Sequence, residues 1–213
     1  MQHDFWHQRW QNQQIGFHLD AVNPLLAAHF QALNLQAGQR VFIPLCGKTL
    51  DIHWLLSQGI QVAGAELNQL AVDTLFAELG VTPTITEHGS LRLYHAEHID
   101  IFQGDFFTLD KGLLGDVDAV YDRAALIALP ANMRIDYSQH LINLTASAPQ
   151  LLISFHYDQS LIEGPPFNVS AEEVAAHYAQ AYDIHLLADE ILPTGLKGKF
   201  PAQEKLWFLN PLK

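Results

Sequence analysis

Two features of the sequence could take part in chemistry on a small ligand, a turn that contains a Gly-Lys-Thr sequence and an acidic residue that follows it. The turn is Cys46-Gly47-Lys48-Thr49 and comes directly after a short apolar segment. Gly-Lys-Thr also ends the phosphate-binding P-loop, but a P-loop needs a glycine five residues before Gly47, where this chain has Phe42. Without that glycine the loop lacks the nest of amides that cradles phosphates, so the sequence disfavours nucleotide hydrolysis.

The acidic residue is Glu66, which lies 21 positions after Leu45. An acid about 20 residues beyond the first turn of a Rossmann unit is placed to accept hydrogen bonds from the ribose hydroxyls of an adenosine. The dinucleotide fingerprint G-x-G-x-x-G is absent, because Gly47 is the only glycine between Val41 and Gly59. Adenosine without a pyrophosphate suggests S-adenosylmethionine. The alternative is a solvated glutamate at the end of a strand.

A pair of tryptophans near the N-terminus could contact such a cofactor. Trp6 and Trp10 are four residues apart, so one face of a helix would present both indoles. The face of an aromatic ring attracts a cation, and the sulfonium of S-adenosylmethionine is a cation. The pair therefore suggests a lid that orders over bound ligand. The alternative is a hydrophobic staple that holds the N-terminal helix on the body of the protein.

The histidines are candidate metal ligands, and the single cysteine is a candidate nucleophile. The pairs His3/His7 and His95/His98 have spacings that could bring two imidazoles together. No third ligand completes a recognisable set, so we predict no metal site. Cys46 is the one cysteine, which excludes an internal disulfide. A nucleophilic cysteine needs a base and an electropositive setting, so we expect Cys46 to have a packing role.

Strand-like and helix-like segments alternate along the chain and must position these residues. Such alternation implies an α/β fold, a mostly parallel sheet with helices on both faces, whose ligands bind beyond the carboxyl ends of the strands. Here those ends are residues 44–49, Glu66, residues 104–107 and residues 121–123. Residues 85–103 suggest an inserted hairpin or irregular strands. The other segments are strands at 40–45, 61–66, 117–121 and 151–155, helices at 23–35, 50–58, 68–79, 130–147 and after 170, and a closing antiparallel pair at 184–192 and 205–209.

Length and charge limit the classes of function. The 213 residues fit one domain, which we place at 1–213 with an N-terminal helical lid of about residues 1–22. With 11 basic and 23 acidic residues the net charge is −12, which disfavours binding to nucleic acid. The apolar runs are too short to cross a bilayer, and the N-terminus lacks the pattern of a secretory signal. We therefore expect a soluble, cytoplasmic protein, and nothing in the sequence demands more than a monomer.

Four motifs together resemble a known family. They are the two tryptophans, residues 41–48 (VFIPLCGK), residues 122–126 (DRAAL) and residues 164–167 (GPPF). In this order and spacing they resemble the thiopurine S-methyltransferases, which belong to the class I S-adenosylmethionine-dependent methyltransferases. The similarity extends over essentially the whole chain. It implies a Rossmann-like, seven-stranded, mostly parallel sheet whose last strand is antiparallel, with helices on both faces.

The resemblance also implies roles for individual residues. S-adenosyl-L-methionine would be the cofactor and S-adenosyl-L-homocysteine the product. Phe17 and His18 resemble a pair that lines the acceptor pocket, whereas Phe167 is interpreted as either a wall of that pocket or part of the core. Arg123 resembles an arginine near both the cofactor and the opening for the substrate, and is the candidate catalytic residue. The residues expected to bind cofactor are Trp6, Trp10, Leu45, Glu66, Asp105, Phe106 and Arg123.

The expected reaction is methyl transfer to the sulfur of an aromatic or heterocyclic thiol. Such an in-line displacement requires mainly alignment and exclusion of water. An aromatic heterocyclic thiol is largely thiolate near neutral pH, so the reaction can proceed without a dedicated general base. Arg123 could stabilise the thiolate or orient the acceptor, and the alternative is an ion pair with Asp122 or another acid. The alternative functions are methyl transfer to another small nucleophile (selenium or tellurium species, oxygen or nitrogen) and a non-catalytic adenosine-binding module.

Overall fold

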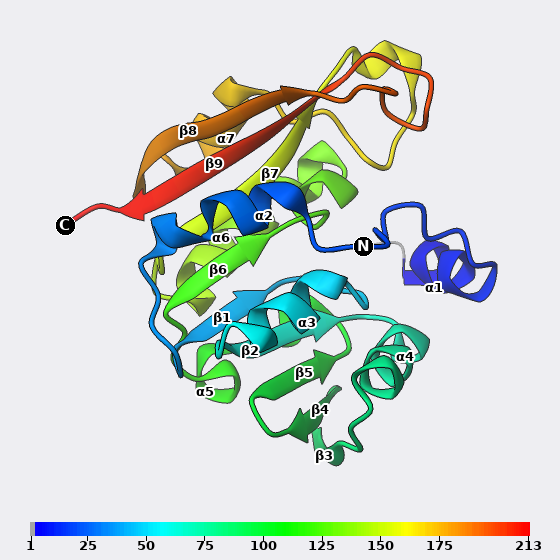
Figure 1. Ribbon diagram of the computed structural model, residues 1–213, viewed down its shortest axis with the longest axis vertical. Coiled ribbons are helices and arrows are strands. Elements are labelled where there is room, and N and C mark those ends of the chain that lie inside the picture. Colours follow the sequence, from blue (N-terminus) through cyan, green and yellow to red (C-terminus); the bar gives the residue numbers. More distant parts are fainter. Residues whose placement is uncertain (1–2) are drawn as a thin grey trace. The chain divides into compact units, whose positions relative to one another are not determined.

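The computed structural model describes residues 3–213, and the chain forms two compact units, residues 1–119 and 120–213. Residues 1 and 2, which the predicted lid includes, lie outside the described residues. No helix in the described part of the chain is long and apolar enough to span a membrane. Figure 1 labels the helices and strands, and the two units are described separately below.

The first unit is a mixed sheet with helices. Its strands lie in the order β3-β4-β5-β2-β1. β1 and β2 pair in parallel, as do β2 and β5, whereas β3 with β4 and β4 with β5 pair antiparallel. The elements are α1 (His3–Gln11), α2 (Pro24–His29), the 3-10 helix η1 (Phe30–Leu33), β1 (Arg40–Ile43), α3 (Leu50–Ser57), β2 (Gln61–Glu66), α4 (Gln69–Leu79), β3 (Thr84–His88), β4 (Leu91–Ala96), β5 (Ile99–Gln103), the 3-10 helix η2 (Phe106–Thr108) and α5 (Lys111–Leu114).

Short-range signals begin and end these helices where the sequence predicts. Asn23 caps α2 by accepting hydrogen bonds from two backbone amides, and Asn68 caps α4 by accepting one from Ala71. Gly59 and Gly80 follow α3 and α4 with φ of +76° and +70°, the left-handed conformation in which a glycine commonly ends a helix. The helix predicted over 23–35 is shorter, because the α-helix ends at His29 and continues as η1.

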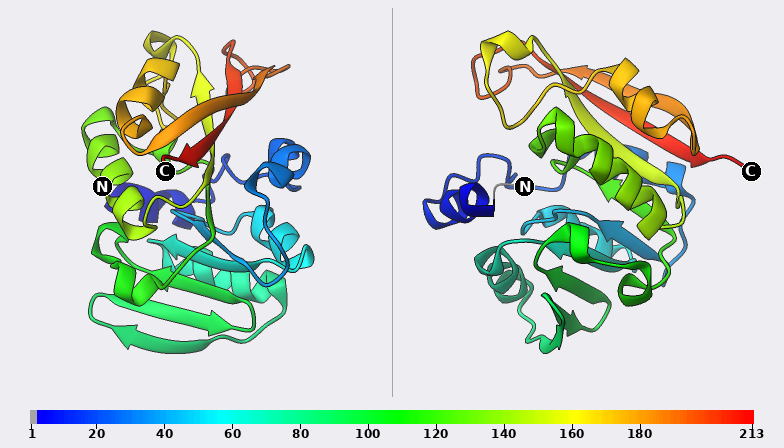
Figure 2. Two further views of the ribbon diagram at one scale, coloured as in Figure 1. Left: turned by 90° about the vertical axis from the view of Figure 1, so that its left-hand side faces the viewer. Right: turned by 180° about the vertical axis from the view of Figure 1, so that it is seen from behind.

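Residues 85–103 form the predicted hairpin and one further strand. β3 and β4 are the antiparallel hairpin, and β5 follows them back into the sheet beside β2. The views in Figure 2 show β3, β4 and β5 side by side. β3 is exposed along its whole length, whereas Tyr94 and Ile101 on the next two strands are buried. The hairpin therefore extends the edge of the sheet, and β5 belongs to its core.

The second unit is a smaller mixed sheet whose strands lie in the order β6-β7-β9-β8. β6 starts at the boundary of the two units and pairs in parallel with β7, and β9 pairs antiparallel with β7 and β8. The predicted closing antiparallel pair is confirmed. The elements are β6 (Ala119–Asp122), the 3-10 helix η3 (Leu126–Ala128), α6 (Ala131–Leu144), β7 (Gln150–His156), the 3-10 helix η4 (Gln159–Leu161), α7 (Ala171–Tyr178), β8 (Tyr182–Ile191) and β9 (Gln203–Pro211).

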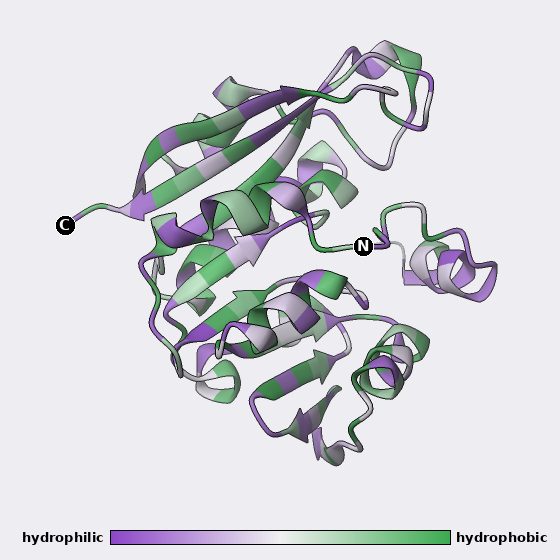
Figure 3. Cartoon of the chain, in the orientation of Figure 1, coloured by the Kyte–Doolittle hydropathy of each residue, from purple (hydrophilic) through white to green (hydrophobic). Residues whose placement is uncertain are grey.

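The predicted α/β class is confirmed. Nine strands are described where the resemblance implied seven, and the hairpin β3-β4 at the edge of the first sheet accounts for the two additional strands. Apolar residues concentrate in the strands, and Figure 3 shows α1 mostly in hydrophilic colours by contrast. The aromatic residues of α1 are Phe5, Trp6 and Trp10, and Trp10 is its buried residue.

Candidate functional site

The turn after β1 has a strained backbone. Leu45 and Gly47 both have positive φ, +47° and +55°, and Leu45 is not a glycine. The left-handed conformation costs a non-glycine residue about 1–2 kcal/mol and persists where the surrounding structure fixes it. Between them, the amide of Cys46 donates a hydrogen bond to the carbonyl of Ala65 across 2.9 Å. The turn is thus held against β2, at the carboxyl ends of two parallel strands.

Glu66 closes β2 and points its carboxylate at this turn. Its Oε2 accepts a hydrogen bond from the amide of Gly47 at 2.8 Å, and its Oε1 accepts one from the amide of Asn68 at 2.7 Å. The residue is only 6% exposed, which contradicts the alternative of a solvated glutamate. Burial raises the pKa of Glu66 to about 7, although the amide donors act in the opposite direction. A carboxylate has about four acceptor positions, so Glu66 retains capacity for further donors such as a ribose hydroxyl.

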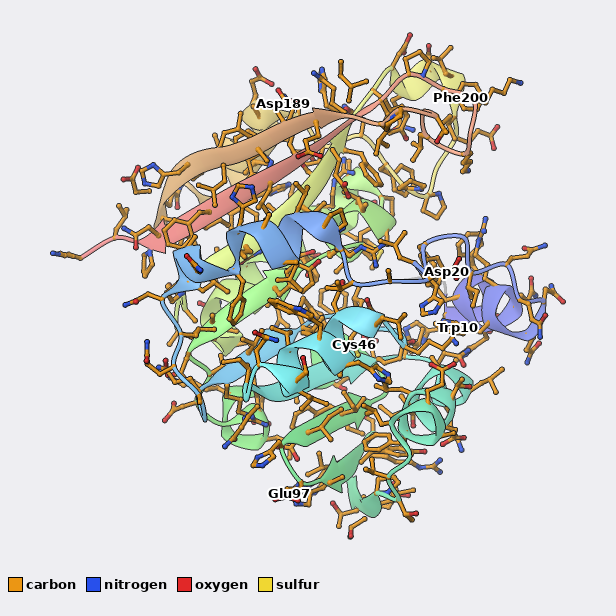
Figure 4. The ribbon with its side chains drawn as sticks, in the orientation of Figure 1. Trp10, Asp20, Cys46, Glu97, Asp189 and Phe200 are labelled. Atoms are coloured by element: carbon orange, nitrogen blue, oxygen red, sulfur yellow. The ribbon has the colours of Figure 1, made fainter. Side chains whose placement is uncertain are left out.

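The aromatic residues of the N-terminal segment gather over the same turn. A Cβ atom added to Gly47 would lie 3.2 Å from Cζ2 of Trp10, so the indole lies directly against the glycine. Trp10 is buried, and its ring centroid lies 5.8 Å from that of Phe17 in an edge-to-face arrangement. Trp6 contacts the same phenylalanine, with centroids 5.9 Å apart. Figure 4 labels Trp10 on the N-terminal segment and Cys46 in the turn after β1.

Two histidines of α1 contact the residues that follow β2 and β5. Nδ1 of His7 lies 3.0 Å from the side-chain nitrogen of Asn68, the cap of α4. Nε2 of His3 lies 3.2 Å from a carboxylate oxygen of Asp105 in the loop after β5. With Trp10 against Gly47, α1 therefore contacts residues that follow three strands of the sheet, β1, β2 and β5. Within residues 3–213, no group of three or more His, Cys, Asp or Glu residues could hold a metal ion.

Asp105 and Phe106, which the resemblance to the family implies as residues that flank the adenine of the cofactor, occupy different settings. Asp105 caps η2 by accepting a hydrogen bond from the amide of Phe107 at 3.0 Å, and its other oxygen meets His3. Phe106 is 1% exposed, and its ring stacks on that of Phe42 with centroids 6.4 Å apart. The ring of Phe106 is thus part of the core, and its backbone remains the part that a ligand could contact. Both assignments stay predictions.

Cys46 has the packing role expected of it. The residue is buried, and a Cβ atom added to Gly64 of β2 would lie 2.8 Å from its sulfur. Burial raises the pKa of the Cys46 thiol well above its usual value, and the charge of Glu66 adds to this effect. The thiol is therefore neutral near pH 7, which does not suit a nucleophile.

Arg123 and Phe167 belong to the second unit. Arg123 follows β6, directly after the buried Asp122. Phe167 is half-buried, and its amide donates a hydrogen bond to the carbonyl of Ile127 across 2.7 Å. The guanidinium carbon of Arg134 lies 5.9 Å from the centroid of the Phe167 ring. The loop that carries Phe167 is thereby fixed to the 3-10 helix that follows the Arg123 turn.

In the first unit the structure brings together Trp6, Trp10, Phe17 and the turn that Glu66 holds. His18 lies next to Phe17, and its amide donates to the carbonyl of Ile15 at 2.8 Å. The contacts that His3 and His7 make from α1 were not predicted from the sequence. A signal existed, because these histidines have the same four-residue spacing as the two tryptophans.

Known proteins of similar sequence point to the same family as the motifs. Residues 1–206 match the family described as Thiopurine S-methyltransferase (TPMT). The chain belongs to the thiopurine S-methyltransferase family. Among its relatives, the protein named Thiopurine S-methyltransferase from Xanthobacter autotrophicus is 52% identical over 211 residues, which cover 99% of each chain. The protein of that name from Acinetobacter baylyi is 50% identical over 215 residues, again 99% of each chain.

Solved structures show the same fold at low sequence identity. An S-adenosylmethionine-dependent methyltransferase from Anabaena variabilis superposes with a TM-score of 0.62 at 16% identity, covering 98% of this chain and 95% of its own. A 1,6-didemethyltoxoflavin-N1-methyltransferase from Burkholderia thailandensis, solved with S-adenosylhomocysteine, superposes with a TM-score of 0.63 at 15% identity, covering 97% and 86%. The predicted Rossmann-like fold is confirmed. The family assignment confirms the predicted enzyme class, an S-adenosylmethionine-dependent methyltransferase.

Proposed function

We propose that this protein transfers the methyl group of S-adenosylmethionine to the sulfur of an aromatic or heterocyclic thiol. The observation that carries the proposal is the buried carboxylate of Glu66 at the turn of Gly47, with α1 in contact with the residues after β1, β2 and β5. The names of the relatives support a thiopurine as acceptor. When bound, S-adenosylmethionine supplies an electrophilic methyl group on a cationic sulfur, and S-adenosylhomocysteine is the product.

The residues of the first unit suit the donor. Glu66 has the acceptor capacity for ribose hydroxyls, and Leu45 offers backbone groups in the turn before it. The indoles of Trp6 and Trp10 would stabilise the sulfonium, because the face of an aromatic ring attracts a cation. Asp105 and the backbone of Phe106 would contact the adenine.

Other residues are proposed to handle the acceptor. Phe17, His18 and Phe167 would contact its ring, and Arg123 would stabilise the thiolate or orient the ring. Positioning of this kind can lower the barrier by several kcal/mol, since the reacting sulfur and carbon must be in line. None of these residues has to remove a proton from an acceptor that is already ionised.

The organisation of the protein is proposed to be a single methyltransferase domain over 1–213 with a lid of about residues 1–22. The contacts that α1 makes with residues at three strand ends support a lid that orders with ligand. We further propose a cytoplasmic monomer that acts in xenobiotic metabolism. The net charge of −12 supports a small-molecule substrate over nucleic acid.

The test is a methyl-transfer assay with labelled S-adenosylmethionine and 6-mercaptopurine, followed by a panel of other acceptors. Labelled S-methyl product supports the proposal. Transfer only to selenium, tellurium, oxygen or nitrogen acceptors would assign the enzyme to that alternative. If calorimetry detects binding of S-adenosylhomocysteine but no acceptor is methylated, the result would support a non-catalytic adenosine-binding module. The Glu66→Ala variant serves as the control for donor-dependent signal.

A further inference from the structure

We propose that Tyr137 is a positioning residue that acts through the buried Asp122 to hold the turn of Arg123 in the conformation used for methyl transfer. The inference rests on the proposed function, in which Arg123 contacts the acceptor. It concerns residues of the second unit alone.

The carboxylate of Asp122 connects helix α6 to the Arg123 turn. Asp122 is the last residue of β6 and is fully buried. Its Oδ2 accepts a hydrogen bond from the hydroxyl of Tyr137 at 2.7 Å, and its Oδ1 accepts one from the amide of Leu126 at 3.2 Å. The bond from the Leu126 amide closes the turn that contains Arg123. The bond from the Tyr137 hydroxyl holds the carboxylate group of Asp122 in place for that contact.

The turn needs such a connection because its backbone is strained. Ala124, the residue after Arg123, has a φ of +60°. A non-glycine residue in this conformation costs about 1–2 kcal/mol, so hydrogen bonds around the turn must hold it there. Loss of the hydrogen bond from Tyr137 would leave the Asp122 carboxylate less firmly positioned to bind the Leu126 amide. Arg123 would then sample other positions.

Tyr137 itself projects from a fixed helix. One turn earlier on α6, the buried Arg134 donates hydrogen bonds to the carbonyls of Leu129 and Asn168, at 3.3 and 3.4 Å. Its Nε also lies 2.7 Å from a carboxylate oxygen of Glu173. These contacts anchor α6 to the segments before and after it, so the Tyr137 hydroxyl is presented from a rigid element.

The charges around Asp122 make the connection sensitive to pH. Tyr137 from α6 donates to this carboxylate, the charge of the carboxylate also acts on the buried Tyr178 of α7, and Arg123 follows Asp122 in the chain. Burial raises the pKa of Asp122 to about 6, and the hydrogen bond from Tyr137 lowers it. Burial raises the pKa of both tyrosines well above the usual value, so both remain neutral. The carboxylate is thus ionised at neutral pH, and removing the Tyr137 hydroxyl would raise its pKa.

The test compares Tyr137→Phe with Tyr182→Phe. Tyr182 is a buried tyrosine of the same unit whose hydroxyl donates to the carbonyl of Ala148 at 3.1 Å, so its variant removes a hydroxyl away from the turn. For Tyr137→Phe we expect kcat/KM for the thiol to fall about tenfold, in the range expected when a buried charged group loses a hydrogen-bond donor. The acid limb of its pH profile should move to higher pH. Tyr182→Phe should alter none of these.

A double-mutant cycle separates positioning from general stability. If Tyr137 acts through Arg123, Tyr137→Phe should have little further effect in an Arg123→Ala background. An equal fall in kcat/KM in both backgrounds, or an acid limb that stays at the position of the parent enzyme, would overturn the inference.

A second readout does not depend on catalysis. Amide hydrogen exchange at residues 123–126 should be faster in Tyr137→Phe and unchanged in Tyr182→Phe. If the parent protein methylates no thiol, the proposed function fails, and faster exchange would still support the structural connection. Exchange that is unchanged in Tyr137→Phe would overturn the inference whatever the activity.

Discussion

The amide of Gly47 donates a hydrogen bond to Oε2 of Glu66 across 2.8 Å, and the indole of Trp10 lies against the same glycine. One residue without a side chain thus brings together the acid at the end of β2 and the ring from α1. The carboxylate is buried in the process, which raises its pKa toward neutrality. These relationships make the donor site open to specific tests.

Glu66→Ala should weaken binding of S-adenosylhomocysteine. A hydrogen bond to a charged group contributes about 1.5–3 kcal/mol, so loss of even one ribose contact corresponds to on the order of 10- to 100-fold in affinity. Isothermal titration calorimetry measures the difference. Glu87→Ala is the matched control, because Glu87 is an exposed acid on β3 that pairs with Arg92. If Glu66→Ala binds the product as tightly as the parent protein, the assignment of Glu66 is wrong.

Donor affinity should also depend on pH through Glu66. Ribose hydroxyls donate to the ionised carboxylate, so binding favours the charged form and lowers a pKa that is about 7 in the unbound protein. Affinity should therefore fall as the pH drops below 7, and binding near that pH should release a proton. Calorimetry in two buffers with different ionisation enthalpies detects that proton. In Glu66→Gln the proton release assigned to this carboxylate should vanish, and release equal to that of the parent protein would point to another group.

The elements of the fold were predictable where short-range chemistry sets them. Asn23, Asn68, Gly59 and Gly80 act on their own helix ends, so the sequence carries their effect. For residues 85–103 the sequence predicted either a hairpin or irregular strands and did not decide between them. The pairing of β5 with β2 joins segments more than 30 residues apart, and no local pattern encodes it.

The site was predictable only where its residues are related by a short spacing in the sequence. Glu66 follows from its spacing after the first turn, but its burial and its two amide donors depend on how the loops close. His7 and Asn68 are 61 positions apart, and Asp122 and Tyr137 are 15 apart. Both contacts exist only once helices dock on strand ends, so no local pattern of the sequence indicates either of them.

Cys46 should react slowly with thiol reagents in the folded protein. Its sulfur is buried against Gly64, and its pKa is raised, so both access and thiolate content are low. We expect modification by Ellman's reagent to follow unfolding in guanidinium and to be much slower in buffer. Rapid, complete modification of the native protein would show that the turn opens far more readily than its contacts indicate.

Gly47→Ala tests whether the turn positions the indole of Trp10. A side chain at this position meets two penalties, the left-handed backbone with φ of +55° and a Cβ atom only 3.2 Å from Trp10. Gly89→Ala is the matched control, because Gly89 has a φ of +62° and open space around its Cβ position. The left-handed backbone by itself should lower the free energy of unfolding of each variant by about 1–2 kcal/mol. Denaturant unfolding measures this loss in both.

Only Gly47→Ala should also displace Trp10. We expect a change in tryptophan emission, faster hydrogen exchange in α1 and weaker binding of S-adenosylhomocysteine in this variant, with none of these in Gly89→Ala. The physical reason is that the indole cannot keep its contact with the turn once a methyl group occupies that space. If the two variants lose the same stability and Gly47→Ala keeps the emission and donor affinity of the parent protein, the contact between Trp10 and Gly47 does not position α1.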